Sequence, residues 1–175
     1  TFNTIGGTGA FSIGLPDSGL GAALIWYFTK NVALMGLVSD ANANRQNLVD
    51  ITKGNLYAGA ELAVRILPRT SKAGYSKFAI WHTDGTSTGE PLNAQLGPSG
   101  WGFFIKLEQE MTADGRGVLI GRYGKSYNGS ALYGQQAGLH WVLNNPYFFG
   151  RISNDALCLA INWVQPNVSE TRDEY

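Results

Sequence analysis

Hydrophobic and polar residues alternate along most of this chain with a period of two. That is the pattern of a β-strand with one apolar and one polar face. Residues 56–66 show it most clearly. The apolar face carries Leu56, Ala58, Ala60, Leu62, Val64 and Ile66, and the opposite face carries Tyr57, Gly59, Glu61, Ala63 and Arg65. Such a strand needs surroundings of different polarity on its two sides.

Residues 100–123 predict a β-hairpin. Residues 112–115 form a polar turn, in which Gly115 can take the positive φ of a tight hairpin connection. The first strand alternates Phe103, Ile105 and Leu107 with Phe104, Lys106, Glu108 and Glu110. The second places Leu119, Gly121 and Tyr123 opposite Ile120 and Arg122. The charged residues of both strands therefore fall on one face.

The same pattern predicts about nine strands over the whole chain, in one domain without an internal boundary. Besides the hairpin, we expect strands at residues 10–15, 20–28, 32–39, 56–66, 75–83, 131–143 and 154–164. Shorter links are expected at 29–31, 68–74, 112–116 and 144–153. Longer polar links are expected at 40–55, with one helical turn near 46–51, at 84–99, and more moderately at 125–130.

Strand length and link length favour a membrane β-barrel. A tilted transmembrane strand needs about 9–11 residues, whereas the mean strand of a globular protein has about 5–6. Short turns at one end of an up-and-down sheet and longer loops at the other are typical of outer-membrane barrels. We therefore predict an all-β fold, an antiparallel up-and-down transmembrane β-barrel.

Charge and aromatic residues are distributed in keeping with that prediction. A Lys or Arg that faces lipid at mid-bilayer costs about 2–4 kcal/mol, and the predicted apolar faces carry almost no charge. Aromatic residues cluster near predicted strand ends, where interfacial girdles lie: Trp26, Tyr27, Phe28, Trp101, Tyr123, Trp141, Tyr147, Phe148, Phe149 and Trp163. A soluble barrel also separates its faces, with the apolar one inside, so alternation alone fits both.

Composition removes several other classes of protein. The 13 basic residues balance the 13 acidic ones, which argues against a nucleic-acid-binding surface. The single cysteine, Cys158, excludes an internal disulfide and a cysteine-rich zinc site. His82 and His140 lie outside any metal-binding spacing, and the chain has no Gly-x-Ser-x-Gly motif. We expect no enzyme, metal or cofactor; a barrel hydrolase using His140 with a serine is the enzymatic alternative.

Four stretches, in this order, resemble the carbohydrate-selective porins of the OprB type. They are LPDSGLGAALIWYFTKNVALMGLVSDAN (residues 15–42), KFAIWHTDG (77–85), GWGFFIKLEQEM with LIGRYG (100–124), and LCLAINWVQPNVSETRDEY (157–175). The resemblance implies a barrel of about sixteen strands, a typical porin size, of which this chain is an internal portion. It also implies the outer membrane of a Gram-negative bacterium, contact with outer-membrane lipid, and a monomer or trimer.

A porin of this family is a water-filled channel for passive diffusion of carbohydrates and other small solutes or ions. Its lining sets its selectivity. Paired charges suit sugar hydroxyls, and an aromatic ring suits the apolar face of a sugar. The predicted pore-lining residues are Glu61, Arg65, Lys77, Trp81, Lys106, Glu108 and Arg122. For the charges, the alternative is an ion-pair ladder in solvent; for Trp81, it is a rim or core aromatic. The alternative functions are a general non-selective porin and a soluble ligand-binding β-barrel.

Overall fold

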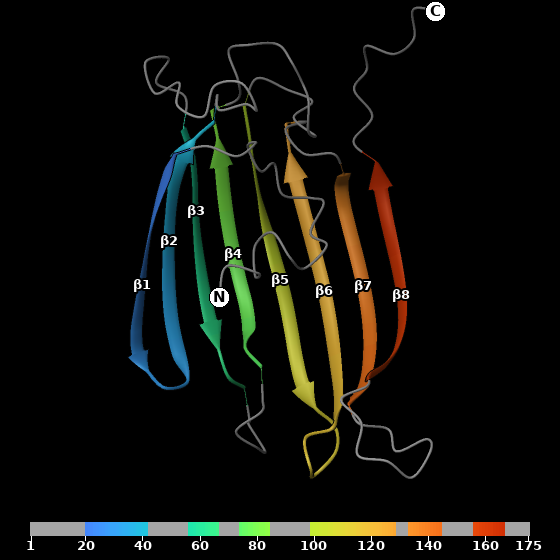
Figure 1. The fold of residues 1–175 in the computed structure, drawn as a ribbon. Coiled ribbons are helices and arrows are strands. Elements are labelled where there is room, and N and C mark those ends of the chain that lie inside the picture. Colours follow the sequence, from blue (N-terminus) through green and yellow to red (C-terminus); the bar gives the residue numbers. More distant parts are fainter. Residues whose placement is uncertain are drawn as a thin grey trace, which may run out of the picture.

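The described part of the chain is a single antiparallel sheet. The computed structural model describes residues 20–41, 56–66, 74–84, 99–128, 133–144 and 156–166. These ranges contain eight strands: β1 (Gly21–Thr29), β2 (Val32–Asp40), β3 (Leu56–Val64), β4 (Ser76–Thr83), β5 (Gly100–Glu110), β6 (Gly117–Tyr127), β7 (Tyr133–Asn144) and β8 (Ala156–Pro166). Each strand pairs with the next in sequence, in the spatial order β1 to β8 (Figure 1). The predicted all-β, up-and-down antiparallel arrangement is confirmed.

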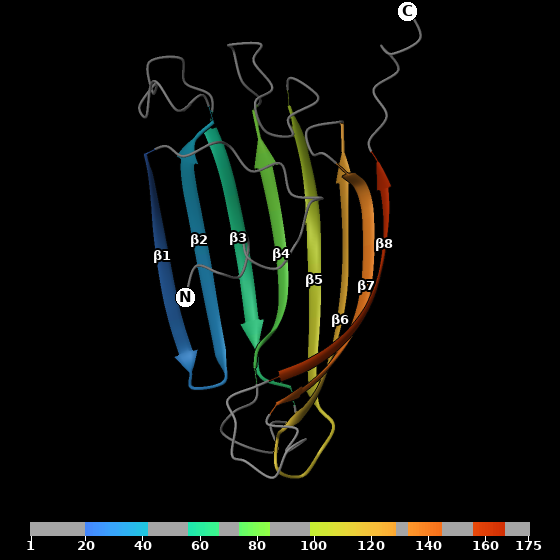
Figure 2. The ribbon, with the colours of Figure 1, turned by 45° about the vertical axis from the view of Figure 1, so that its right-hand side comes forward.

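The sheet is curved and has two edges. Figure 2 shows that it curls on the side of β7 and β8. Within the described residues, β1 and β8 are the edge strands, and no strand pairs with the outer side of either. Closure into a barrel therefore stays a prediction. The predicted strand at 10–15 and the helical turn near 46–51 lie outside the described residues.

Strand pairing fixes which side chains share a face, because opposed residues in a ladder point the same way. One ladder position runs from Met35 through Glu61 and Ala79 to Phe104, and on to Gly124 and Gln136. We call this side the polar face and the opposite side the apolar face. Register shifts occur only near Tyr27 and Tyr133, in the β1–β2 and β7–β8 pairs. The alternation read from each separate strand thus continues across the whole sheet.

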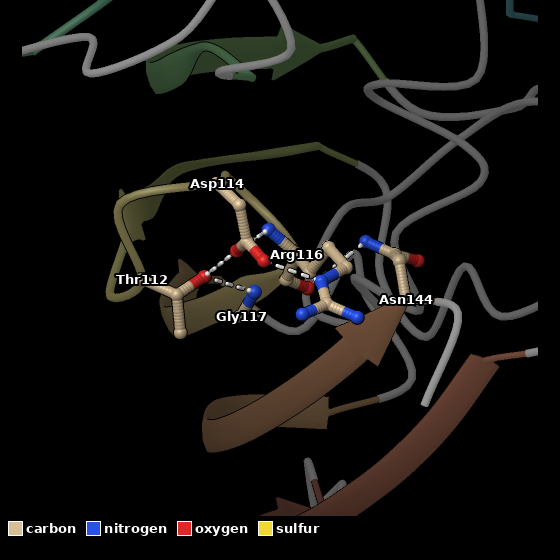
Figure 3. Close-up of polar contacts among 5 residues, drawn as sticks. All are labelled: Thr112, Asp114, Arg116, Gly117 and Asn144. Carbon is tan, nitrogen blue, oxygen red and sulfur yellow. Dashed lines mark hydrogen bonds and ion pairs between the residues drawn. The ribbon is translucent and has the colours of Figure 1, made fainter. Parts of the chain in front are cut away.

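The β5–β6 turn is held by its own polar side chains (Figure 3). Thr112 Oγ1 donates to Asp114 Oδ1 over 2.7 Å and accepts from the Gly117 amide over 2.8 Å. The Asp114 carboxylate also accepts from the backbone amide and Nε of Arg116. Gly115 has a φ of 68°, as the sequence predicted. The pKa of Asp114 is well below its ordinary value, mainly because of the hydrogen bond from Thr112 and then those from Arg116.

The turn also meets the neighbouring strand. The backbone amide of Asn144, the last residue of β7, donates to the Arg116 carbonyl over 2.9 Å. Its side-chain amide donates to the same oxygen over 3.3 Å. We call this end of the sheet, which holds the β1–β2 and β5–β6 turns, the turn end. The opposite end is the loop end.

One sequence prediction about the links needs correction. The predicted polar loop at 125–130 is wrong in its first half, because Lys125, Ser126 and Tyr127 belong to β6. Tyr127 stacks on Trp101 with ring centroids 4.3 Å apart, and this contact extends the hairpin. The lengths of the links are close to those predicted. Links at the turn end run from two to eleven residues, and those at the loop end from five to sixteen.

Candidate functional site: the polar face of the sheet

The structure brings the predicted pore-lining residues together on the polar face. Glu61 on β3, Lys77 and Trp81 on β4, Lys106 and Glu108 on β5, and Arg122 on β6 occupy ladder positions of the same parity. Arg65 lies just beyond β3, where its amide donates to the Asn31 carbonyl over 2.9 Å. For the six residues that lie in strands, the prediction that their side chains share one face is confirmed. That this face lines a pore stays a prediction.

Three cationic side chains occupy directly opposed positions on three neighbouring strands, in the middle of this face. Lys77 is directly opposite Lys106, and Lys106 is directly opposite Arg122. Neighbouring strands are about 4.8 Å apart, so the row spans about 10 Å. We call it the basic row. Like charges in directly opposed positions destabilise a sheet, so the row requires nearby carboxylates.

Glu61 and Glu108 flank the basic row, one on each side. Glu61 lies two ladder positions nearer the loop end, and its Oε1 is 3.1 Å from Lys77 Nζ. Glu108 lies two ladder positions nearer the turn end, and its Oε2 is 2.5 Å from Lys106 Nζ. The Glu61–Lys77 pair is deeply buried, with side-chain exposures of 4% and 8%. A buried pair is costly to break, because a single remaining charge would be left without compensation.

Trp81 is packed rather than exposed. Its side chain packs against Gly102, where an added Cβ would approach two ring atoms to 2.8 Å. Its ring also stacks on Tyr57, with centroids 6.3 Å apart and planes 18° apart. Together with Met35, Ala79 and Phe104 these rings form a buried apolar cluster on the polar face. In this arrangement Trp81 is a core aromatic and presents no open ring surface to a solute.

A small cavity lies between the Glu61–Lys77 pair and the turn end. It has a volume of about 90 Å³, and Ala33, Met35, Tyr27 and Tyr75 also line it. Glu61 Oε2 is buried and has no hydrogen-bond partner. The Tyr75 hydroxyl is already occupied, because it donates to the Lys30 carbonyl over 3.0 Å. Arg65 lies over the Tyr75 ring, 4.7 Å from its centroid.

Sequence reasoning did not single out several residues of this face as candidate site residues. Tyr57 and Phe104 were placed there by alternation, but their complete burial depends on packing between strands. Tyr75 was not singled out, because only the fold brings it beside Glu61. The same holds for the contact between His140 Nε2 and Asn162 Oδ1, which are 2.9 Å apart on β7 and β8. Gly138 makes room for that contact, since an added Cβ would lie 2.4 Å from Asn162 Oδ1.

The apolar face has a wide aliphatic band. Leu24, Ile80, Leu139 and Ile161 project from it with exposures of 72%, 64%, 50% and 72%. Among the described strand residues, the charged or histidine side chains on this face are Asp40, His82 and Lys125, and each lies within two residues of a strand end at the loop end. The middle of this face is therefore both uncharged and uncovered.

Aromatic residues border the aliphatic band at both ends. Trp101 and Tyr127 stack at the loop end, and Trp26 and Phe28 stack at the turn end with centroids 5.4 Å apart. Trp141 on β7 lies opposite Leu119, eight residues along β6 from Tyr127. At about 3.4 Å per residue this separation is about 27 Å along the strand. A tilt of about 40° reduces it to about 21 Å, a little less than the apolar band of about 25 Å in an outer-membrane barrel.

Part of the predicted aromatic girdle lies near strand ends on the apolar face: Trp26, Phe28, Trp101 and Trp141. Tyr123 and Trp163 are on the same face but near the middle of their strands, in register with Ile105 and Ala137. Tyr27 pairs with Ala33 and belongs to the polar face. Tyr147, Phe148 and Phe149 lie outside the described residues.

At the loop end, Asp84 accepts a hydrogen bond from the Leu56 amide over 3.1 Å and contacts His82 Nε2 at 2.9 Å. Both contacts lower the pKa of Asp84, and the hydrogen bond from the Leu56 amide is the larger cause.

Comparison with known proteins gives no relative. No family model, no curated protein and no solved structure matches the chain. The described ranges contain no helix long and apolar enough to cross a membrane. They also contain no group of three or more side chains suited to hold a metal ion.

Proposed function

We propose that this chain forms part of the wall of a bacterial outer-membrane porin, a water-filled channel for passive diffusion of carbohydrates and other small hydrophilic solutes. The observation that carries the proposal is the inverted burial of the two faces. Ile80 on the apolar face is 64% exposed, whereas Lys77 on the polar face is 6% exposed. A soluble barrel buries its apolar face, while a membrane barrel turns that face outward to lipid.

The aromatic borders support the same orientation. Trp and Tyr favour the level of the lipid headgroups, where the ring is in an apolar region and the polar atom reaches water. Stacked aromatic pairs occur at both ends of the aliphatic band. A hydrocarbon layer would cover that band and would leave the charged loop-end residues in the interface.

The open edges favour a barrel larger than these eight strands. Backbone N–H and C=O groups in hydrocarbon must all be paired, so a sheet that spans a membrane has no free edge. Both faces of β1 are exposed, as the side chains of Ile25 on the polar face and Leu24 on the apolar face show. We propose that further strands of a porin barrel pair with β1 and β8.

The polar face suits neutral solutes. Lys77 and Lys106 each have a carboxylate partner. With Arg122, the three cations of the basic row and the two flanking carboxylates leave one net positive charge at the centre of this face. A single net charge gives such a lining only a weak preference between anions and cations. The same balance also fits general diffusion of small solutes, which is the second candidate function.

The proposal is tested by extraction of the protein from membranes and single-channel recording in a planar bilayer, with and without maltose or glucose. Conductance steps that sugar blocks would support a carbohydrate channel. Steps that sugar leaves unchanged would support general diffusion. A protein that stays soluble without detergent and gives no steps would reverse the assignment of the two faces.

A further inference from the structure

The ladder position of the basic row continues as far as β8. Arg122 on β6 is directly opposite Gly138 on β7, and Gly138 is directly opposite Asn162 on β8. Neighbouring strands are about 4.8 Å apart, so the backbones of Arg122 and Asn162 are about 10 Å apart. The residue between them is a glycine, which has no side chain. The row therefore has a gap over Gly138 that side chains can enter from both sides.

Three side chains converge on this gap. Asn162 Oδ1 and His140 Nε2 both lie over the glycine, because a Cβ added to Gly138 would approach each of these atoms. From the other side, the Arg122 guanidinium lies within electrostatic range of Cys158 on β8, two strands away. Arg122 therefore extends across β7. We call Arg122, His140 and Asn162 the Gly138 cluster.

The strands around the Gly138 cluster carry no acidic side chain. The described strands β6, β7 and β8 contain no aspartate or glutamate. In the ladder, the acidic residue next to Arg122 is Glu108 on β5, which is paired with Lys106. The Glu108 carboxylate fills the space where a Cβ of Gly74 would lie, so it is directed toward β4 rather than β6. The net positive charge at the centre of the polar face is therefore placed at Arg122.

The Gly138 cluster presents N–H donors to a surface that water reaches. His140 Nε2 is 2.9 Å from Asn162 Oδ1. A carbonyl oxygen only accepts, so His140 Nε2 carries the proton in this contact. Within the described residues, the two N–H groups of Asn162 Nδ2 have no hydrogen-bond acceptor. Asn162 is exposed, and Arg122 and His140 are partly exposed, so a solute on the polar face can contact them.

A positive charge with N–H donors beside it, on strands without carboxylates, is suited to an oxyanion. We infer that the Gly138 cluster binds the carboxylate or phosphate group of an anionic solute. Arg122 supplies the charge and a planar fork of donors that matches two oxygens of either group, and Asn162 supplies a neutral donor. This inference goes beyond the proposed function, because it adds a charged class of solute and requires only that water reaches the polar face.

The test is a titration of the purified full chain, in an uncharged detergent, with inorganic phosphate and separately with acetate. Binding is followed by nuclear magnetic resonance line broadening of the anion. We expect saturable binding of at least one of the two anions, and the ratio of the two affinities shows whether phosphate or a carboxylate is the better ligand. If neither anion binds saturably to the wild-type protein, the inference is overturned.

Two pairs of variants locate the site. Arg122→Gln should weaken binding about tenfold or more, the range for one hydrogen bond to a charged group. Lys125→Gln removes the same charge from the opposite face of β6 and should leave binding unchanged. Asn162→Asp should also weaken binding, because it places a carboxylate beside Arg122, whereas Gln165→Glu adds a carboxylate to the apolar face of β8 and should not. Equal effects within either pair would place the anion elsewhere and refute the inference.

Binding and conduction are separate readouts. A channel that conducts but binds neither anion would retain the proposed function and exclude the Gly138 cluster as an anion site. A protein that binds an anion at Arg122 but gives no conductance steps would support the site and contradict the porin.

Discussion

The contact between Trp81 and Gly102 predicts that two glycine-to-alanine substitutions on neighbouring strands change stability in opposite directions. On Gly102, a Cβ would lie 2.5 Å from the Lys125 carbonyl oxygen and 2.8 Å from two atoms of the Trp81 ring. Backbone cannot move aside as a flexible side chain can. The ring is equally confined, because it is buried and stacked on Tyr57.

The expected magnitudes follow from these distances. Overpacking by one methyl group in a tight site costs about 1–3 kcal/mol, so Gly102→Ala should destabilise the protein by about that amount. On Gly121, a Cβ meets nothing within 4 Å. Gly121→Ala should stabilise by about 0.4–1 kcal/mol, because alanine restricts the unfolded chain.

The measurement is reversible urea unfolding of the two variants and the wild type in the same detergent or vesicle, followed by tryptophan fluorescence. Gly121→Ala is the matched control, since it adds the same methyl group to the next strand of the sheet. Equal effects of the two substitutions, or an unchanged midpoint for Gly102→Ala, would refute the packing of Trp81 over Gly102.

Three further predictions concern the two faces and the turn. Ile80→Lys should destabilise the vesicle-inserted protein by about 2–4 kcal/mol if the apolar face meets lipid; urea unfolding showing little change would indicate a solvated face. Asp114 has a folded pKa below its unfolded value of about 3.9. Its stabilisation is therefore complete above about pH 4 and is lost as the pH falls through the folded pKa. Asp114→Asn should reduce the change of the urea unfolding midpoint between about pH 5 and 2. An unaltered dependence of the midpoint on pH would contradict the turn contacts. Lys77→Glu should raise cation preference, and an unchanged reversal potential under a salt gradient would argue against a lumen position for Lys77.

The two faces of each strand could be predicted from sequence because they depend on local alternation. The order of the strands could be predicted because each strand pairs with the next along the chain. Glu61 and Leu62 are assigned to opposite faces by position alone, and the register confirms this. The link at 125–130 was mispredicted because Lys125 and Ser126 look like loop residues. What keeps them in β6 includes the stacking of Tyr127 on Trp101, a residue from another strand.

The candidate site was predictable as a set of residues but not as an arrangement. Alternation places Lys77, Lys106 and Arg122 on one face, yet only the register shows that they are directly opposed on neighbouring strands. The burial of Trp81 likewise depends on Gly102, which is 21 residues away in sequence and on the next strand. Tyr75 comes to line the small cavity beside Glu61 for the same reason. These relations are set by pairing between strands, which no single segment encodes.

The two open edges have a consequence for the order of events in folding. Alternate residues of a strand direct their backbone groups to opposite sides, so β1 and β8 each present a row of donors and acceptors away from the sheet. In hydrocarbon each such unpaired group costs several kcal/mol. If the sheet spans a bilayer, as proposed above, its strands cannot cross one at a time. The hydrogen-bond ladders would then have to be completed before or during the crossing, so that insertion and strand pairing form one concerted step.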